Sequence, residues 1–139
     1  MIAYDLDGVL VADLDYAVLL TKYSAEEIAV IRSYMSPIFK PSVPYIIITG
    51  RPDFEFDSSY TWLCRYFSES EKPIEFFHFN PDWERAADYK IMVLNTHPMI
   101  DIFYESDETQ VELIRKKLTT ECRIIWWQNF LRNHNIMEI

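Results

Sequence analysis

Glycine, cysteine and basic residues are all scarce in this sequence, and each shortage narrows what the protein can be. Only 2 of the 139 residues are glycine, so we expect each to occupy a backbone position that requires one. The two cysteines, Cys64 and Cys122, lie far apart and form no CxxC pair. This spacing argues against a zinc site or a disulfide framework, and it favours reduced thiols buried in the interior.

Positive charge is scarce because acidic residues outnumber basic ones by 22 to 13, which gives a formal net charge of −9. Broad binding of nucleic acid requires several Lys and Arg side chains on phosphates, and no basic run is present. The partners that this charge allows are a small phosphorylated molecule held through a metal ion, or the terminal phosphate of a nucleic acid held locally.

Long hydrophobic runs are also missing. The first residues lack the basic region and apolar stretch of a signal peptide, and no apolar run approaches the roughly 20 residues that span a bilayer. We therefore expect a soluble, cytoplasmic protein without a membrane-spanning segment. Apolar residues make up 50% of the chain, so it can bury a sizeable core. The length of 139 residues fits one domain that covers positions 1–139.

What the chain does contain is an alternation of short apolar runs with helix-like stretches. The runs show little polar alternation, which is typical of strands covered on both faces in a parallel sheet. Strands are predicted at positions 1–4, 44–48, 74–79, 99–104 and 123–127. Helices are predicted to begin at the capping residues Ser24, Ser59, Asp82 and Asp107. We expect a three-layer, Rossmann-like α/β fold, with a mostly parallel five-stranded sheet and helices on both faces.

Acidic residues follow the first predicted strand directly. Asp5 and Asp7 are separated by one apolar residue, and Gly8 comes next. Ligands in such sheets bind beyond the carboxyl ends of the strands, so these acids are candidates to bind a metal. An EF-hand loop would have glycine at the position of Leu10 and glutamate at that of Tyr16, so that loop type is excluded. The alternative is a solvated turn.

A second candidate site follows the second strand, at Thr49, Gly50 and Arg51. A hydroxyl, free backbone amides and a guanidinium at a strand end can all hold phosphate oxygens. A turn capped by the threonine would have the same sequence, so this alternative stays open.

Charged residues flank the fourth strand. Lys90 lies on the helix before it, where it either faces solvent or runs along an apolar helix face toward the sheet. Glu105 and Asp107 come after the strand. They would complete a magnesium site or cap the next helix, whose positive dipole end favours acids. One of the two acids can bind the metal while the other caps the helix.

Taken in order, these motifs resemble the haloacid dehalogenase-like phosphohydrolases over about residues 1–118. The resemblance implies that Asp5 is a nucleophile that forms an aspartyl-phosphate and that Asp7 is the general acid. It also implies that Thr49 donates to a phosphate oxygen and that Lys90 pairs with Asp5 and the phosphoryl group. A raised pKa at Asp7, near its acidic neighbours, would suit its role.

The same resemblance implies a Mg²⁺ cofactor. The carboxylate of Asp5 and the backbone carbonyl of Asp7 would bind the ion, together with a side chain from the last motif. That motif departs from the family pattern because Ser106 separates its two acids. Glu105 is the first choice for the remaining ligand, and Asp107 is the second.

The stretch 103–110 is also similar to the phosphatase domain of phage polynucleotide kinase, which acts on 3′ ends of nucleic acid. That similarity would put Arg51 beside the phosphate. The intervals after the first two motifs leave room for helices and loops only, so we expect minimal or no cap and an open site. The aromatic cluster of Trp126, Trp127 and Phe130 is either core, which we favour, or the surface of a homodimer.

The expected function is Mg²⁺-dependent hydrolysis of a phosphomonoester through an aspartyl-phosphate. A nucleotide, a sugar phosphate and a 3′-phosphorylated end all remain open as substrates. One alternative is a non-catalytic module that binds metal or phosphate on the same fold. Another is transfer of the phosphoryl group to an acceptor other than water.

Overall fold

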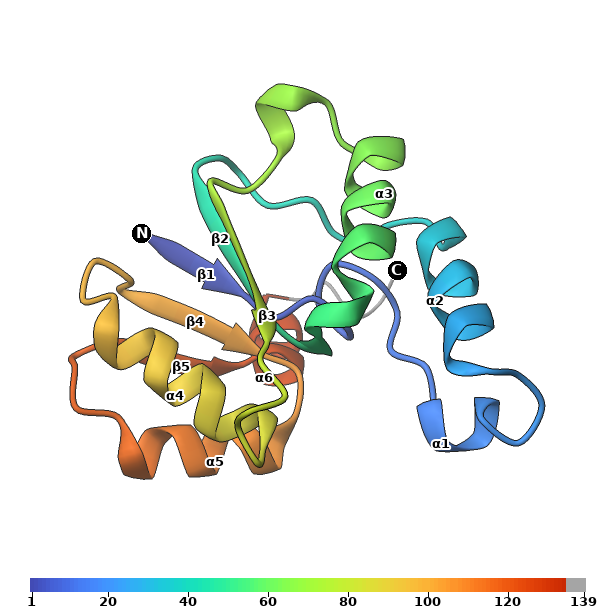
Figure 1. Cartoon of the computed structure of the whole chain (residues 1–139). Helices are drawn as coiled ribbons and strands as arrows, with labels where there is room; N and C mark the ends of the chain where they lie inside the picture. Colours follow the sequence, from blue (N-terminus) through green and yellow to red (C-terminus); the bar gives the residue numbers. More distant parts are fainter. Residues whose placement is uncertain (135–139) are drawn as a thin grey trace.

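The computed structural model describes residues 1–134 of the chain. Its five-stranded sheet is parallel throughout, in the order β3-β2-β1-β4-β5 (Figure 1). The strands are β1 (Ile2–Tyr4), β2 (Tyr45–Pro52), β3 (Glu75–Phe79), β4 (Ile102–Glu105) and β5 (Arg123–Trp126). This arrangement confirms the predicted Rossmann-like α/β fold.

The central strand β1 fixes where a site can form. Ala3 lies opposite Ile46 of β2 and Phe103 of β4, and all three are buried. The chain adds β2 and β3 on one side of β1 and then crosses to add β4 and β5 on the other. The loops that leave β1 and β4 therefore diverge, and such a reversal leaves a crevice at the carboxyl ends of the strands where ligands bind.

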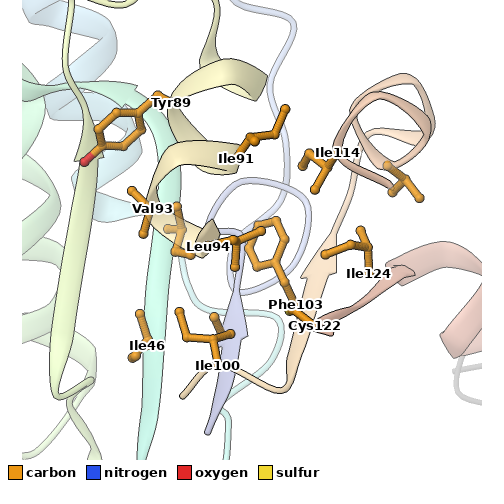
Figure 2. Packing of buried hydrophobic residues seen from close by; sticks show 13 residues of the cluster. Ile46, Tyr89, Ile91, Val93, Leu94, Ile100, Phe103, Ile114, Cys122 and Ile124 are labelled. Atoms are coloured by element: carbon orange, nitrogen blue, oxygen red, sulfur yellow. The ribbon is translucent and has the colours of Figure 1, made fainter. Parts of the chain in front are cut away.

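One face of the sheet is covered by α4 (Ala86–Thr96) and α5 (Glu108–Lys117), as Figure 1 shows. In the core beneath them, Leu94 of α4 and Ile114 of α5 pack with Ile46 and Phe103 of the sheet (Figure 2). Burying one such aliphatic or aromatic side chain contributes about 1.5–3 kcal/mol. This packing anchors α4, the helix that carries Lys90, against the sheet.

The opposite face is covered by α3 (Phe56–Tyr66) and α6 (Trp127–Asn133), and α2 (Ala25–Tyr34) contacts α3. Trp62 of α3, Tyr45 of β2 and Trp127 of α6 belong to one buried aromatic cluster on this face. Trp127 is only 3% exposed. The interpretation of this tryptophan as core is therefore confirmed, and helices lie on both faces of the sheet as expected.

Short helical segments fill the intervals after β1 and β2. The first interval contains α1 (Tyr16–Leu19) and α2, and the second contains η1 (Asp53–Glu55), α3 and η2 (Glu69–Glu71). In Figure 1, α1 and α2 extend beyond the sheet edge beside α3. Within residues 1–134, these intervals hold short helices and loops and no domain-sized insertion.

Two of the predicted helix starts are confirmed. The Ser24 hydroxyl accepts from the Glu27 amide at 3.1 Å, and the Glu27 carboxylate accepts from the Ser24 amide at 3.0 Å, which is a capping box. The Asp107 carboxylate accepts from the amides of Thr109 and Gln110 at the start of α5. These side chains satisfy amides that a helix start otherwise leaves unbonded.

The other two predicted starts are wrong. The helix α3 begins at Phe56, because η1 already starts a helical run after Pro52, so Ser59 lies inside it. The helix α4 begins at Ala86 rather than at Asp82. The Asn80 side chain accepts from the Asp82 amide at 2.9 Å. This turn closed by an asparagine competes with helix formation and delays α4 by a turn.

Two further expectations concern membranes and thiols. No helix within residues 1–134 is both long and apolar enough to cross a bilayer. Cys122 is buried as expected, but the expectation is wrong for Cys64, which is exposed on α3 and accepts a hydrogen bond from Lys72 at 3.3 Å. The two thiols are free.

Candidate active site

A small hollow of about 130 Å³ lies at the carboxyl ends of β1, β2 and β4. It is lined by Asp5, Asp7, Asp13, Gly50, Arg51, Lys90, Glu105, Ser106, Asp107 and Gln110. Every residue predicted for the site lines this hollow except Thr49. The sequence separates these residues by up to about a hundred positions, and the parallel sheet brings them together because its carboxyl ends share one edge.

Lys90 is the centre of a buried ionic cluster in the hollow. Its Nζ lies 2.6 Å from Glu105 Oε1, 3.5 Å from Asp5 Oδ1 and 3.0 Å from Gln110 Oε1. The lysine is 2% exposed, so the alternative of a solvent-facing side chain is wrong. Its neighbours on α4 pack on the sheet, and this packing turns the Lys90 stem inward along the same face.

The two carboxylates around Lys90 have opposite pKa shifts. Burial raises the pKa of Asp5 well above its ordinary value, and the nearby Glu105 carboxylate raises it further. Burial also opposes the charged form of Glu105, but Lys90 outweighs it and lowers the pKa of Glu105. One ammonium therefore faces two acids, and the charged form is disfavoured at Asp5 rather than at Glu105. A further cation beside Asp5 would favour its charged form.

Asp7 and Arg51 form the second ion pair of the hollow. Arg51 Nε and one terminal nitrogen donate to the two Asp7 oxygens at 2.8 and 2.7 Å, a bidentate contact. The other terminal nitrogen donates to Ser59 Oγ at 3.1 Å. Burial alone would raise the pKa of Asp7, but Arg51 lowers it below its ordinary value. The expected raised pKa is therefore wrong for this arrangement, because the nearest charge is a guanidinium rather than an acid.

Ser106 links the two acids that follow β1. Its hydroxyl oxygen lies 2.9 Å from Asp5 Oδ2 and 2.9 Å from the backbone carbonyl oxygen of Asp7. One hydroxyl carries a single proton, so it can satisfy only one of these acceptors at a time. Sequence reasoning treated Ser106 only as a spacer. Its position directly after a buried strand, between two acids, was the signal available.

A cation at this point would meet oxygen donors from the Asp5 carboxylate, the Asp7 carbonyl and the Ser106 hydroxyl. Mg²⁺ is bound by oxygen ligands, commonly through one or two carboxylates, and it keeps several waters. The donor set therefore fits Mg²⁺. Within residues 1–134, no cluster of three or more His, Cys, Asp or Glu side chains is arranged to hold a metal. The set is thus poor in charge, with one carboxylate and two neutral oxygens.

The two acids of the last motif are engaged elsewhere. Glu105 is fully buried, and its oxygens bond Lys90 at 2.6 Å and the Asp107 amide at 3.1 Å. The Asp107 carboxylate lines the hollow while it caps α5. The alternative of helix capping therefore describes Asp107, and Glu105 acts on Lys90.

Both glycines have structural reasons at the site. Gly8 has a φ of +85°, and a Cβ there would lie 2.7 Å from the Cβ of Ser106. A side chain would therefore strain the backbone and displace Ser106. At Gly50, a Cβ would lie 3.2 Å from that of Ala86, so glycine permits the close approach of β2 and α4. The expectation that both glycines occupy special positions is confirmed.

Thr49 is fully buried behind the hollow, and its hydroxyl accepts from the Arg51 amide at 3.1 Å. Thr49 and Arg51 both belong to β2, whose pairing with β3 shifts register between Thr49 and Pro52, so the interpretation of this stretch as a capped turn is wrong. Asp13 and Gln110 also line the hollow, and sequence reasoning did not single them out for it. Burial raises the pKa of Asp13, and the Asp7 carboxylate adds to this shift.

Comparisons of this chain with models of protein families, with curated proteins and with solved structures found no match. The class that the structure defines is therefore a Rossmann-like α/β protein with an acidic, lysine-containing hollow at the carboxyl edge of its sheet.

Proposed function

We propose that the protein is a Mg²⁺-dependent phosphomonoester hydrolase of the haloacid dehalogenase-like type, with Asp5 as nucleophile. The observation that carries the proposal is the contact of the buried Asp5 carboxyl with both Lys90 and Ser106 at the end of the central strand. A buried acid with a strongly shifted pKa in a hollow is a candidate for catalysis. The hollow of about 130 Å³ is small, as suits a phosphoryl group.

In the first step, the Asp5 carboxylate attacks phosphorus, and a P–O bond forms while the bond to the leaving oxygen breaks. A carboxylate and a phosphate charge repel by about 4 kcal/mol at about 4 Å and an effective dielectric of about 20. Lys90, 3.5 Å from Asp5, offsets this repulsion. The leaving oxygen takes a proton from the Asp7 carboxyl group, which must therefore enter the step protonated.

Arg51 controls whether Asp7 can carry that proton. In the ligand-free arrangement its bidentate contact keeps Asp7 charged. A phosphate dianion in the hollow is a competing acceptor for the same guanidinium fork. Transfer of the fork to phosphate would remove the main cause of the low pKa at Asp7. Substrate binding thereby prepares the general acid.

In the second step, the Asp7 carboxylate takes a proton from water, whose oxygen attacks phosphorus. The bond between Asp5 and phosphorus then breaks, and inorganic phosphate leaves. Covalent catalysis of this kind divides one difficult displacement into two easier ones. Mg²⁺, held by Asp5, the Asp7 carbonyl and Ser106, would supply positive charge for the phosphoryl oxygens in both steps.

A non-catalytic module that binds metal or phosphate is the second candidate. Two observations favour it: the neutral Ser106 among the metal-facing groups, and the bidentate contact that lowers the pKa of Asp7. Such a protein would bind Mg²⁺ or phosphate in the hollow and release no product.

The experiment measures phosphate release from an aryl phosphate, with Mg²⁺ and with chelator, for the wild type and for Asp5→Asn. We expect release that requires both the metal and Asp5. A folded protein that binds Mg²⁺ and releases no phosphate from any ester would support the non-catalytic module instead. Full activity in Asp5→Asn would remove Asp5 from the nucleophile role.

A further inference from the structure

A second, larger cleft of about 400 Å³ adjoins the catalytic hollow. It is lined by Asp7, Tyr16, Arg32, Gly50, Arg51, Pro52, Phe54 and Glu55. Asp7, Gly50 and Arg51 belong to both spaces, so the two meet where the proposed general acid lies. A phosphate ester whose phosphoryl group occupies the hollow would thus extend its leaving group into this cleft. The volume lies within the range of pockets that enclose small organic ligands, about 300–1,000 Å³.

The cleft is walled by flat side chains from three separate segments. Phe54 of η1 is 65% exposed, although it is a large apolar residue beside a charged site. Tyr16 begins α1 and is only partly exposed. The Arg32 guanidinium of α2 lies over the Tyr16 ring, with its carbon 5.1 Å from the ring centroid. Aromatic rings and guanidinium planes are the surfaces on which planar aromatic ligands stack.

Arg32 also supplies unused hydrogen-bond donors at the cleft. The residue is buried, and one terminal nitrogen donates to Glu55 Oε1 at 3.1 Å. Glu55 is itself buried, so both charged groups are removed from water. This desolvation costs free energy that apolar side chains at the same positions would not cost. Within residues 1–134, the Arg32 Nε–H has no hydrogen-bond partner. A guanidinium carries five N–H donors, and the contact with Glu55 uses only part of them, although the Nε–H is itself buried.

We propose that this cleft binds the nucleoside part of a nucleoside monophosphate, with the base stacked against Phe54 and the Tyr16–Arg32 pair. This inference rests on the proposed hydrolase function and names its substrate class. A base offers a planar aromatic ring and acceptor atoms for Arg32, whereas ribose has no aromatic ring. The net charge of −9 disfavours a long polynucleotide, so the substrate is a single nucleotide.

The first test compares kcat/KM for the four ribonucleoside 5′-monophosphates with that for ribose 5-phosphate, which has the same phosphate ester and no base. We expect the nucleotides to be preferred, with a ratio of at least about tenfold for the best one. In Phe54→Ala this ratio should fall by about tenfold, because the variant loses the ring on which the base stacks. The matched control is Phe56→Ala, an exposed aromatic residue two positions away that does not line the cleft.

The second test needs no catalysis and separates the two proposals. Binding of the four unphosphorylated nucleosides to Asp5→Asn is measured by calorimetry and by the NMR signals of Phe54 and Tyr16. Binding that Phe54→Ala abolishes supports the cleft even if no ester is hydrolysed, in which case only the hydrolase proposal fails. Hydrolysis without nucleotide preference, together with binding of none of the nucleosides, overturns the cleft and leaves the hydrolase proposal standing. If no ester is hydrolysed and none of the nucleosides binds, both proposals are overturned.

Discussion

The two ion pairs of the hollow differ in charge balance, although both begin from the loop after β1. Around Lys90, one ammonium faces the carboxyl groups of Asp5 and Glu105, and the pKa of Asp5 is raised. Around Arg51, one guanidinium faces one carboxylate in a bidentate contact, and the pKa of Asp7 is lowered. The group around Lys90, which we call the first half of the hollow, has one cation for two acids. The Arg51–Asp7 pair, the second half, has one cation for one acid.

This difference shows how the two halves would respond to ligands. A cation would bind the first half, because it supplies the missing charge beside Asp5. A phosphate dianion would act on the second half, because it competes with Asp7 for Arg51. If the proposed function holds, a metal and a phosphate ester would therefore bind at different parts of one hollow.

The largest effect is expected for Asp5→Asn. An amide is a poor nucleophile, so hydrolysis should fall by at least about 1,000-fold in kcat. Stability should not fall, since the native carboxyl is buried with its pKa raised and the amide carries no charge. Phosphate release and thermal unfolding measure the two effects. Asp57→Asn, an exposed acid on α3, is the control, and a matching loss there would point to a general effect of substitution.

Lys90→Met should destabilise the fold by about 3–5 kcal/mol, because it leaves Glu105 buried without its cation. Urea unfolding at pH 7 measures the free energy of unfolding. Adding Glu105→Gln to Lys90→Met should recover part of the loss by removing the stranded charge. If the double variant is no more stable than the single one, charge balance is not what Lys90 contributes.

His78 of β3 should make stability depend on pH. Its ring stacks on Phe76, and burial, aided by the positive charge of Arg51, lowers its pKa from 6.5 to about 4. Between these values the unfolded chain binds the proton and the folded chain does not. Stability should therefore fall as pH decreases from about 6.5 to about 4, by at most about 3 kcal/mol, and stay constant above 6.5.

His78→Phe isolates this contribution because it keeps a flat ring on Phe76 and removes the titrating group. Urea unfolding of both proteins from pH 4 to pH 8 measures the difference. We expect the wild-type curve to lose more stability than the variant below pH 6.5. Carboxylates that titrate in this range are present in both proteins and affect both curves equally. Parallel curves would therefore show that His78 does not cause the loss of stability at low pH.

The smallest effect is expected at Ser106, the neutral side chain among the groups that would hold the proposed Mg²⁺. Ser106→Asp adds a second carboxylate, so Mg²⁺ should bind about tenfold more tightly, because affinity rises with ligand charge. Without Mg²⁺ the same variant should be less stable, since the new charge lies beside Asp5. Calorimetry with Mg²⁺ measures the affinity, and Ser106→Ala serves as the control without an oxygen. Equal affinity in all three proteins would show that the ion does not bind at Ser106.

Much of the fold was predictable from local patterns. Apolar runs without polar alternation predicted all of the strands to within a few residues, and the capping residues Ser24 and Asp107 predicted two helix starts. The two wrong predictions of helix starts also have local causes. The Asn80 turn delays α4 beyond Asp82, and η1 starts the helical run before Ser59. Both turns depend on side-chain bonds and backbone angles that periodicity does not encode.

Within the site, the sequence identified residue types and their order, because strand ends and spacing are local features. It thus marked Asp5, Asp7, Arg51 and Lys90, which line one hollow. The resemblance already implied that Lys90 pairs with Asp5, and only the tertiary structure decided the other contacts. Parallel strands brought Ser106 to the two acids after β1, across about a hundred residues, and the packing of α4 on the sheet brought Lys90 to Glu105. Charge balance and pKa depend on such distances and on burial, so no pattern of residues along the chain determines them.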